Sequence, residues 1–312
     1  MSKPRFTWMD GRITPWEESV VHVNTDAFLR GTNVFEGVRA YVSDDGSNLL
    51  VFRLEDHLQR LFGTSMRVLR LSLPYNERAV AAAVLETLRA NEIREDTHIR
   101  IVAYFGEGKE ASFLPEDIST GCFILTLPRP SHPAVHTGIT ACVSPWRRIA
   151  DNSMPPRIKA GANYLNSRLA TVDARLKGFE LPILLNERGK VAEGPGQCIF
   201  LVRRGTVISP RTTDGILESI TRETVLDLAR QLGIPCEVRE VDFTELYIAD
   251  ELFFAGTAAE VLPIVDVDHY VIGDGSVGST TAQLQTAYVD VVRGVSPSPP
   301  GWVTQVYDHV VG

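Results

Sequence analysis

A run of prolines near position 130 sets the strongest limit on how this chain can fold. The segment Leu127–Pro133 carries prolines at 128, 130 and 133. Proline lacks a backbone N–H donor and restricts the residue before it, so neither a helix nor a central strand can continue through this segment. The chain has 312 residues, and domains commonly hold about 100 to 200 residues each. The run therefore predicts a linker at 129–138 between one domain at 1–128 and another at 139–312.

The residues before the linker predict a mixture of strands and helices. Asp10-Gly11 can supply the positive φ angles of a tight type I′ turn, which predicts a hairpin over 5–13. Apolar residues recur on one face of a helix expected over 54–69, and a second helix is expected over 76–91. Strands are expected within 31–41 and at 98–105 and 121–127. This order predicts a small α/β domain within an α+β protein.

After the linker, the pattern favours strands joined by short turns. Gly189-Lys190 and Arg204-Gly205 are typical of hairpin turns. Strands are expected at 140–143 and 181–185, a buried strand that runs into a turn of small residues is expected within 251–261, and helices are expected at 218–232 and 280–293. The second domain is therefore predicted to be β-rich with a few helices.

Composition limits the classes of partner. The 31 basic and 39 acidic residues give a net charge of −8, which argues against nucleic acid and anionic membranes as partners. No apolar run resembles a signal peptide or reaches the roughly 18 residues of a membrane span. The four cysteines are widely spaced in apolar contexts, which suits free thiols in the cytoplasm. No CxxC pattern occurs, and no metal site is predicted.

Lys159 is the residue with the most distinctive surroundings. It is followed by Ala160-Gly161-Ala162, and these small residues leave room for a bulky planar ligand. Asn163 is expected to cap a helix in which Leu165, Leu169 and Val172 recur at helical spacing. The pattern predicts that Lys159 ends a strand or turn and points into a cleft, where a shielded amine can form a Schiff base with a carbonyl. By itself, the segment is more typical of an exposed lysine before an ordinary helix, because exposed lysines far outnumber catalytic ones.

Five segments, taken in order, resemble the class IV (fold-type IV) aminotransferases that use pyridoxal phosphate, and most closely the branched-chain amino-acid aminotransferases. They are GTNVFEGVRAY at 31–41, Arg60, the Lys159 loop, Glu193 within VAEGPGQ, and Thr257 within AGTAAE. The resemblance extends from about Trp8 to Gly294. It implies a small N-terminal α/β domain followed by a larger β-rich pseudo-barrel domain with helices.

The resemblance also implies roles around the cofactor. Lys159 would form the Schiff base and move the proton between the substrate Cα and the cofactor, while Glu193 would keep the pyridine nitrogen protonated. Tyr164 would donate to the phenolate oxygen of the cofactor. The phosphate would be bound by Arg60, although its place off the apolar stripe alone predicts exposure, and by a helix N-terminus. The remaining cofactor-binding residues would be Leu217, Ile220, Thr221 and Thr257.

The expected substrate site departs from the usual pattern of the family. Arg30 and His98 stand where aromatic residues are usual, and Arg129 and His132 replace an aromatic pair. Arg100 matches an arginine that receives the distal carboxylate of glutamate in similar enzymes. These groups predict an amino donor more polar than leucine. The alternative is an ordinary branched-chain donor, with these side chains turned to solvent or the match displaced in the proline-rich segment around Arg129 and His132. The residues expected at the substrate are Phe35, Gly37, Arg39, Arg30, His98, Arg100, Thr257 and Ala258.

The function implied is transfer of an amino group between an L-amino acid and 2-oxoglutarate by a ping-pong mechanism, in a homodimer or larger homo-oligomer. Four alternatives stay open. One is a lyase similar to aminodeoxychorismate lyase, and another is a D-amino-acid or amine transaminase. A third is a non-catalytic relative that only binds ligands. The last is a dehydrogenase built on the GxGxxG pattern at 273–278, which lacks a following strand with an acidic ribose partner.

Overall fold

The structure is a computed structural model that describes residues 3–109 and 112–307. The chain divides into two compact units. Unit 1 comprises 1–130, 158–162 and 290–312, and unit 2 comprises 131–157 and 163–289. Two segments that follow the proline run in sequence therefore group with unit 1. The expected domain boundaries at 128 and 139 remain a prediction.

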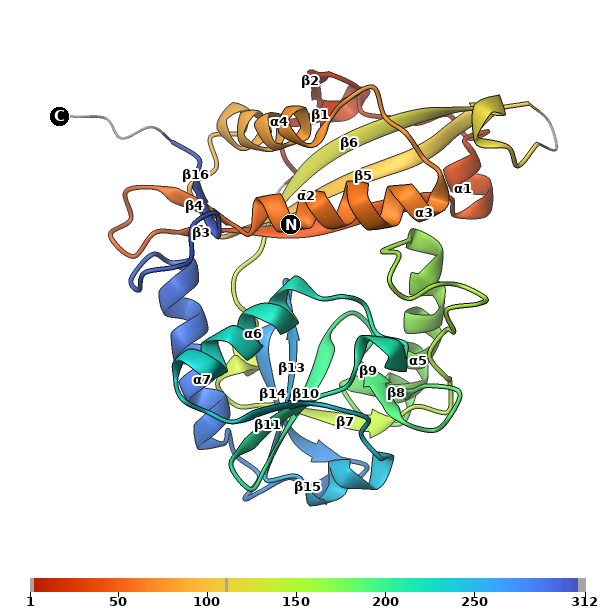
Figure 1. Ribbon diagram of the computed structural model, residues 1–312. Coiled ribbons are helices and arrows are strands. Elements are labelled where there is room, and N and C mark those ends of the chain that lie inside the picture. Colours follow the sequence, from red (N-terminus) through yellow and green to blue (C-terminus); the bar gives the residue numbers. More distant parts are fainter. Residues whose placement is uncertain (1–2, 110–111, 308–312) are drawn as a thin grey trace. The chain divides into compact units, whose positions relative to one another are not determined.

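Unit 1 contains an antiparallel sheet of seven strands in the order β16-β4-β3-β5-β6-β1-β2 among the described residues (Figure 1). The hairpin expected over 5–13 is confirmed, with Asp10 at φ 47° and Gly11 at φ 97° between its strands. The strands are β1 (Phe6–Met9), β2 (Arg12–Pro15), β3 (Asn33–Val42), β4 (Leu49–Phe52), β5 (Thr97–Gly108), β6 (Ile118–Pro128) and β16 (Val303–Gln305).

Helices cover one face of this sheet. The helix expected over 54–69 is confirmed, but a π-helical segment, η2 (Leu61–Met66), interrupts it. Asn76 caps the second expected helix by accepting a hydrogen bond from the N–H of Ala79. Leu58 and Leu61 pack with Val34 of β3 in the core of the unit. The helical elements are η1 (Trp16–Glu18), α1 (Asp26–Arg30), α2 (Leu54–Arg60), η2, α3 (Arg67–Leu69), α4 (Glu77–Ala90) and η3 (Pro115–Asp117).

Unit 2 contains a sheet that closes on itself. From β10 the pairing runs through β13, β14, β7, β8 and β9, and β9 returns to β10 through the pair Glu193 and Cys198. This closure confirms the β-rich pseudo-barrel. The strands are β7 (Ile139–Val143), β8 (Leu181–Leu185), β9 (Val191–Glu193), β10 (Cys198–Arg203), β11 (Thr206–Ser209), β12 (Cys236–Val238), β13 (Glu251–Gly256), β14 (Glu260–Val267) and β15 (Tyr270–Val271).

Three longer helices are interspersed with the strands of unit 2 along the sequence, and both helices expected at 218–232 and 280–293 are confirmed. The last residues of α7, from Asp290, group with unit 1. No helix in the described part of the chain is long and apolar enough to cross a membrane. The helices are η4 (Pro133–Val135), η5 (Gly161–Asn163), α5 (Tyr164–Leu176), η6 (Thr212–Asp214), α6 (Ile220–Gln231), η7 (Phe243–Ile248) and α7 (Ser279–Val292).

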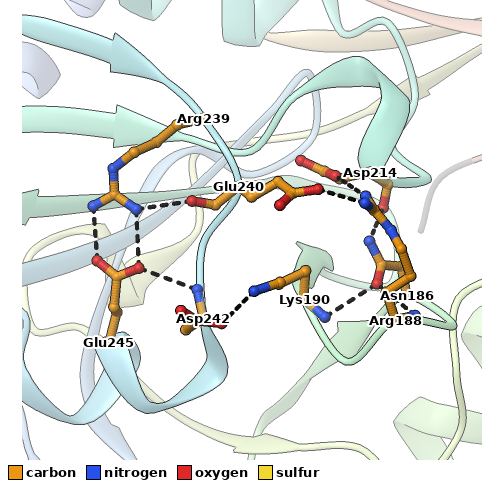
Figure 2. A network of polar contacts seen from close by, with 8 residues as sticks. All are labelled: Asn186, Arg188, Lys190, Asp214, Arg239, Glu240, Asp242 and Glu245. Atoms are coloured by element: carbon orange, nitrogen blue, oxygen red, sulfur yellow. Dashed lines mark hydrogen bonds and ion pairs between the residues drawn. The ribbon is translucent and has the colours of Figure 1, made fainter.

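A network of charged side chains connects the loop before α6 to two other loops of unit 2 (Figure 2). Arg188, in the β8–β9 turn, lies 2.8 Å from the carboxylate of Asp214 and 2.6 Å from that of Glu240. Lys190 pairs with Asp242 at 2.6 Å. The Asp214 side chain is buried at the end of η6. The network therefore ties three loops of unit 2 together on the approach to Leu217 and α6.

The start of α5 differs from the expected cap. Asn163 has helical dihedral angles and its side chain makes no capping hydrogen bond. Its amide instead donates to the carbonyl of Pro155 at 3.2 Å. The dihedral angles of Asn163 are helical because η5 already leads into the helix. The cap prediction is therefore wrong. The apolar stripe of Leu165, Leu169 and Val172 is also exposed, with 62%, 39% and 49% of each residue accessible.

Candidate active site

Lys159 lies on unit 1, where its backbone is bonded to β3. Its carbonyl accepts a hydrogen bond from the N–H of Phe35 at 2.9 Å, and Ala160 forms an isolated bridge with Val34. The Lys159 Nζ lies 5.2 Å from the centroid of the Phe35 ring. A Cβ on Gly161 would lie 2.6 Å from Asn33 Oδ1. The Asn33 side chain therefore fills the space beside Gly161, so a residue without a side chain suits the packing against β3 as well as the approach of a ligand.

Arg60 is buried, contrary to the exposure predicted from its place off the apolar stripe. Its Nε and Nη2 donate to the two carboxylate oxygens of Glu36, at 2.8 and 2.6 Å. His57 Nδ1 lies 2.7 Å from the same carboxylate. Glu36 itself is fully buried on the helix-covered side of β3. The partner supplied by this strand explains why a charged side chain can leave solvent here.

The charges in this triad follow from its surroundings. Burial alone raises the pKa of Glu36, but the charge of Arg60 and the hydrogen bonds from His57 and Arg60 outweigh it and lower the pKa to about 2. Burial lowers the pKa of His57, and Glu36 opposes this only in part. Glu36 is therefore an anion at neutral pH, and a neutral His57 donates to it through Nδ1. The positive charge of Arg60 is therefore balanced by the negative charge of Glu36.

Glu36 makes the free energy of unfolding depend on pH in the acidic range. Its pKa falls from an ordinary 4.5 to about 2 on folding, so its stabilisation is fully present above 4.5 and is lost as the pH falls towards 2. We expect the difference in unfolding free energy between the parent and Glu36→Gln to stay constant above about pH 5 and to shrink below it. Chemical unfolding at a series of pH values measures this difference, and a constant difference down to pH 2 would contradict the assignment.

The opposite face of β3 and β5 carries several of the expected substrate residues. Phe35 and Gly37 alternate with buried Val34 and Glu36 along β3, and Gly37 pairs with Arg100 of β5. The Arg100 guanidinium lies 5.5 Å from the centroid of the Phe35 ring. Phe35 therefore lies near both the exposed guanidinium of Arg100 and the Lys159 Nζ, so that both cationic groups contact the same aromatic ring.

His98 lies on the same face and depends on the glycine at 37. A Cβ at Gly37 would lie 2.7 Å from His98 Cε1. Burial, followed by the charges of Arg100, Arg129, Arg39 and Lys159, lowers the pKa of His98 to about 3. The imidazole is therefore neutral at physiological pH. Its Nδ1 is buried without a hydrogen-bond partner among the described residues.

The other expected polar substrate residues are more dispersed. Arg39 is buried, and it donates to the carbonyl of Arg129 at 2.6 Å and lies 4.6 Å from the Tyr41 ring. Arg30, the last residue of α1, pairs with Asp26. His132 belongs to unit 2, is exposed, and accepts from the N–H of Ala134. Substrate contact by these residues remains a prediction.

Glu193, in unit 2, is held at the end of β9 by a guanidinium that the sequence did not indicate. Arg148 Nη2 lies 2.6 Å from one carboxylate oxygen, and the N–H of Leu217 donates to the other at 3.2 Å. Both charged side chains are buried. Cys198, the cross-strand neighbour, has its sulfur 4.0 Å from the carboxylate. Leu217 therefore contributes through its backbone, and the short chain between η6 and α6 determines its position.

The remaining cofactor-binding candidates of unit 2 lie at element ends. Ser219 caps α6 by accepting from the N–H of Arg222 at 3.1 Å, and Ile220 and Thr221 are buried in its first turn. Thr257 and Ala258 form the half-buried turn between β13 and β14. Tyr164 begins α5 and is 37% exposed. The twelve-residue helix presents backbone N–H groups, which favour an anion such as a phosphate.

Three polar partners of the candidate site went unrecognised in the sequence: Glu36, His57 and Arg148. A signal existed for the first, because Glu36 interrupts the inward row of Val34, Val38 and Ala40 along β3. An acid at an inward position requires a buried partner, and His57 and Arg60 are three residues apart on one helix. No comparable pattern marks Arg148, which lies in a loop after β7.

Comparison with known proteins identifies the family. Residues 33–267 match the family described as amino-transferase class IV. A probable branched-chain-amino-acid aminotransferase of Aquifex aeolicus is 40% identical over 306 residues, 97% of each chain. The crystal structure of the branched-chain amino acid aminotransferase from Thermobaculum terrenum in its PLP form has a TM-score of 0.93 and 41% identity, covering 99% of this chain and 100% of that one.

A third relative is informative for its ligand. The T.th. branched-chain amino acid aminotransferase complexed with N-(5'-phosphopyridoxyl)-L-glutamate has a TM-score of 0.92 and 34% identity, covering 98% of this chain and 100% of that one. The chain therefore belongs to the class IV aminotransferase family. It is a transaminase that depends on pyridoxal phosphate, and it is similar over nearly its whole length to branched-chain aminotransferases.

The residues present fit this cofactor. In unit 2, a buried carboxylate at Glu193 suits a ring nitrogen, while the N-terminus of α6 suits a phosphate. The backbone at Gly196 is open, since a Cβ there would meet only Tyr164 Cε1, at 3.8 Å. A planar ring can therefore approach the backbone beside Glu193. In unit 1, Lys159 carries a primary amine, the group that chemistry on this cofactor requires.

Proposed function

We propose that the enzyme moves an amino group between an L-amino acid and 2-oxoglutarate by a ping-pong mechanism. The observation that carries the proposal is the shared position of Lys159 and Arg100 at Phe35. A general base and a receptor for a carboxylate then act on one substrate from the same face of unit 1. The glutamate-derived ligand of the T.th. relative supports glutamate and 2-oxoglutarate as one substrate pair.

The proposed roles divide between the two units. When bound, pyridoxal phosphate supplies an electron-accepting ring. Lys159 Nζ carries the proton that leaves the substrate Cα, and Glu193 holds the proton on the ring nitrogen. Arg60 binds the phosphate together with the helix N-terminus at Ile220 and Thr221, the Leu217 segment and the Thr257 hydroxyl. The Tyr164 hydroxyl orients the ring by donating to its phenolate oxygen. Chain continuity supports joint action, since only four residues separate Lys159 and Tyr164.

The structure supports an amino donor more polar than leucine. The buried His98 Nδ1 lacks a protein partner among the described residues, and such a group costs free energy unless something bonds to it. A hydroxyl, amide or carboxylate on the substrate provides that bond, whereas an aliphatic side chain does not. Arg100 and Arg129 lie close enough to lower the pKa of His98, and they favour negative charge on the same face.

Half-reactions with a panel of amino donors test this preference. We expect His98→Phe to raise kcat/KM for leucine relative to polar donors by about tenfold or more. An aromatic ring in place of a polar group should change the discrimination between the two kinds of donor by roughly 1 to 3 kcal/mol. His132→Phe is the matched control, since that histidine is exposed and belongs to unit 2. If Leu, Ile and Val outrank every polar or acidic donor except glutamate in the parent enzyme, the polar-donor proposal is wrong.

The same assays distinguish the acceptor and the reaction class. Recovery of the starting absorbance spectrum on adding 2-oxoglutarate, with release of glutamate, is the expected result after the first half-reaction. Recovery with pyruvate but not with 2-oxoglutarate would exclude the proposed acceptor. Release of pyruvate from an amino acid without any acceptor would instead identify a lyase. Use of D-amino acids in preference to their L-forms would contradict the proposed stereochemistry.

We also propose that the enzyme is a homodimer or larger assembly in the cytoplasm. Exposed apolar residues on α5, among them Leu165 and Leu176 at 62% and 84% accessible, support association. Sedimentation equilibrium measures the assembly, and a monomer at micromolar concentration would exclude it. The four cysteines are free thiols, which suits a reducing compartment.

A further inference from the structure

Lys159 is fixed through its backbone at two points that lie far away in sequence. Its carbonyl accepts from Phe35 of β3 at 2.9 Å. Its N–H donates to the hydroxyl oxygen of Ser65 at 3.1 Å. Together these bonds hold both peptide groups next to the Lys159 Cα, and so they set the direction in which its side chain leaves the chain. Phe35 and Ser65 therefore position the lysine from two different elements.

Ser65 occupies an unusual place for a hydroxyl. It follows Leu58 by seven residues and lies in the helical stripe that packs on the core, yet it is polar and fully buried. A buried hydroxyl without a hydrogen bond costs free energy, so an alanine would suit this position better if packing were its only role. The bond to Lys159 accounts for the serine.

The backbone around Ser65 is also unusual. Ser65 lies within the π-helical segment η2, which begins directly after Arg60. Short π-helical segments are rare and occur frequently at functional sites, because they change the direction of the side chains that follow. The same helix carries Arg60, which is bonded to Glu36 of β3. β3 and the interrupted helix therefore fix the positions of both Arg60 and Lys159.

We propose that Ser65 is a positioning residue for Lys159. The proposal rests on the proposed function, in which Lys159 Nζ carries the proton. Ser65 contacts the main chain of the lysine and acts only through it, by restricting rotation about the backbone bonds of Lys159. A displacement of about 1 Å at a reacting group can lower a rate by as much as a hundredfold. Loss of Ser65 should therefore lower kcat and leave KM for the amino donor little changed.

Ser65→Ala in the full-length holoenzyme tests the proposal. We expect deuterium exchange at the Lys159 amide, resolved by fragmentation of peptides that span 157–161, to become about fivefold faster, the size expected for one hydrogen bond. We expect kcat to fall by at least about tenfold with KM within twofold. If Ser65→Ala folds poorly, Ser65→Cys takes its place in the test. The cysteine fills the same site but is only a weak acceptor, so the same changes in exchange rate and kcat are expected.

Thr87→Val is the matched control. The Thr87 hydroxyl is fully buried in α4 of unit 1 and donates to the carbonyl of Ala83, so this variant also loses a buried hydroxyl without affecting the Lys159 segment. Unchanged exchange at Lys159 in both Ser65 variants, or a kcat equal to that of Thr87→Val, would overturn the proposal. Full activity of Lys159→Ala would refute the proposed function instead, because the exchange comparison reports on the hydrogen bond whatever the lysine does.

Discussion

Lys159→Ala is expected to abolish transamination while leaving the fold intact. Both backbone hydrogen bonds of residue 159, to Ser65 and Phe35, survive the substitution. The side chain is only partly buried, so its removal opens no core cavity. What is lost is the amine that carries the proton in the proposed function. General acid–base catalysis alone contributes about 10² to 10⁴ in rate, and we expect a loss of at least that size.

Steady-state turnover and thermal unfolding of the variant measure the two halves of this expectation. Lys177→Ala is a suitable control, because Lys177 is exposed and pairs with Asp173 one turn earlier. Turnover of Lys159→Ala within tenfold of the parent would exclude the assigned role, since tenfold corresponds to only about 1.4 kcal/mol of transition-state stabilisation. Cofactor binding by other contacts is compatible with the prediction.

Glu193→Gln is expected to lower turnover by several orders of magnitude with the phosphate site intact. A neutral amide cannot hold the ring nitrogen as a pyridinium, so the ring withdraws electrons less strongly. The amide oxygen can still accept from the N–H of Leu217, which preserves the approach to α6. Arg148, which lies 2.6 Å from the carboxylate, then loses its charge partner in a buried site, and some loss of stability is expected as well.

Single-turnover kinetics separates these effects. The rate of proton abstraction from the substrate Cα should fall in the variant, whereas retention of the cofactor after dialysis should not. Glu245→Gln supplies the control: Glu245 bonds to Arg239 at 2.7 Å in the charged network of unit 2 (Figure 2), so that variant also removes a carboxylate paired with arginine. An unchanged rate of proton abstraction in Glu193→Gln would remove Glu193 from this role.

Elements governed by local periodicity were predictable from the sequence. The helix at 77–90 has a regular apolar face and an asparagine cap, and the hairpin at 5–13 has a turn that only a few residue pairs favour. These features depend on neighbours within about one turn, and a sequence shows such neighbours directly. Asn163 failed as a cap because it belongs to η5, which already supplies helical geometry.

Side-chain partners were much less predictable. The order of Arg60, Lys159, Glu193 and Thr257 along the chain was sufficient to indicate the family. It could not indicate that Arg60 is bonded to Glu36, because Arg60 comes 24 positions later in the chain. Alternation along β3 places Glu36 inward, but only the packing of α2 on that strand supplies the guanidinium. Arg148 and Glu193 meet for a similar reason, because the loop after β7 is bonded to Leu185 of β8, the strand next to β9.

The sequence by itself therefore determined the family, the cofactor and the order of the elements, because each of these depends on residue types at fixed spacings. The tertiary structure decided how the candidate residues are held. It placed 158–162 with unit 1 although its neighbours on both sides belong to unit 2, and it bonded Lys159 to Ser65, 94 residues earlier. Such contacts form when strands and helices pack, and packing depends on the whole chain at once. For that reason the identity of the lysine was apparent early, whereas the means by which it is positioned became apparent only in three dimensions.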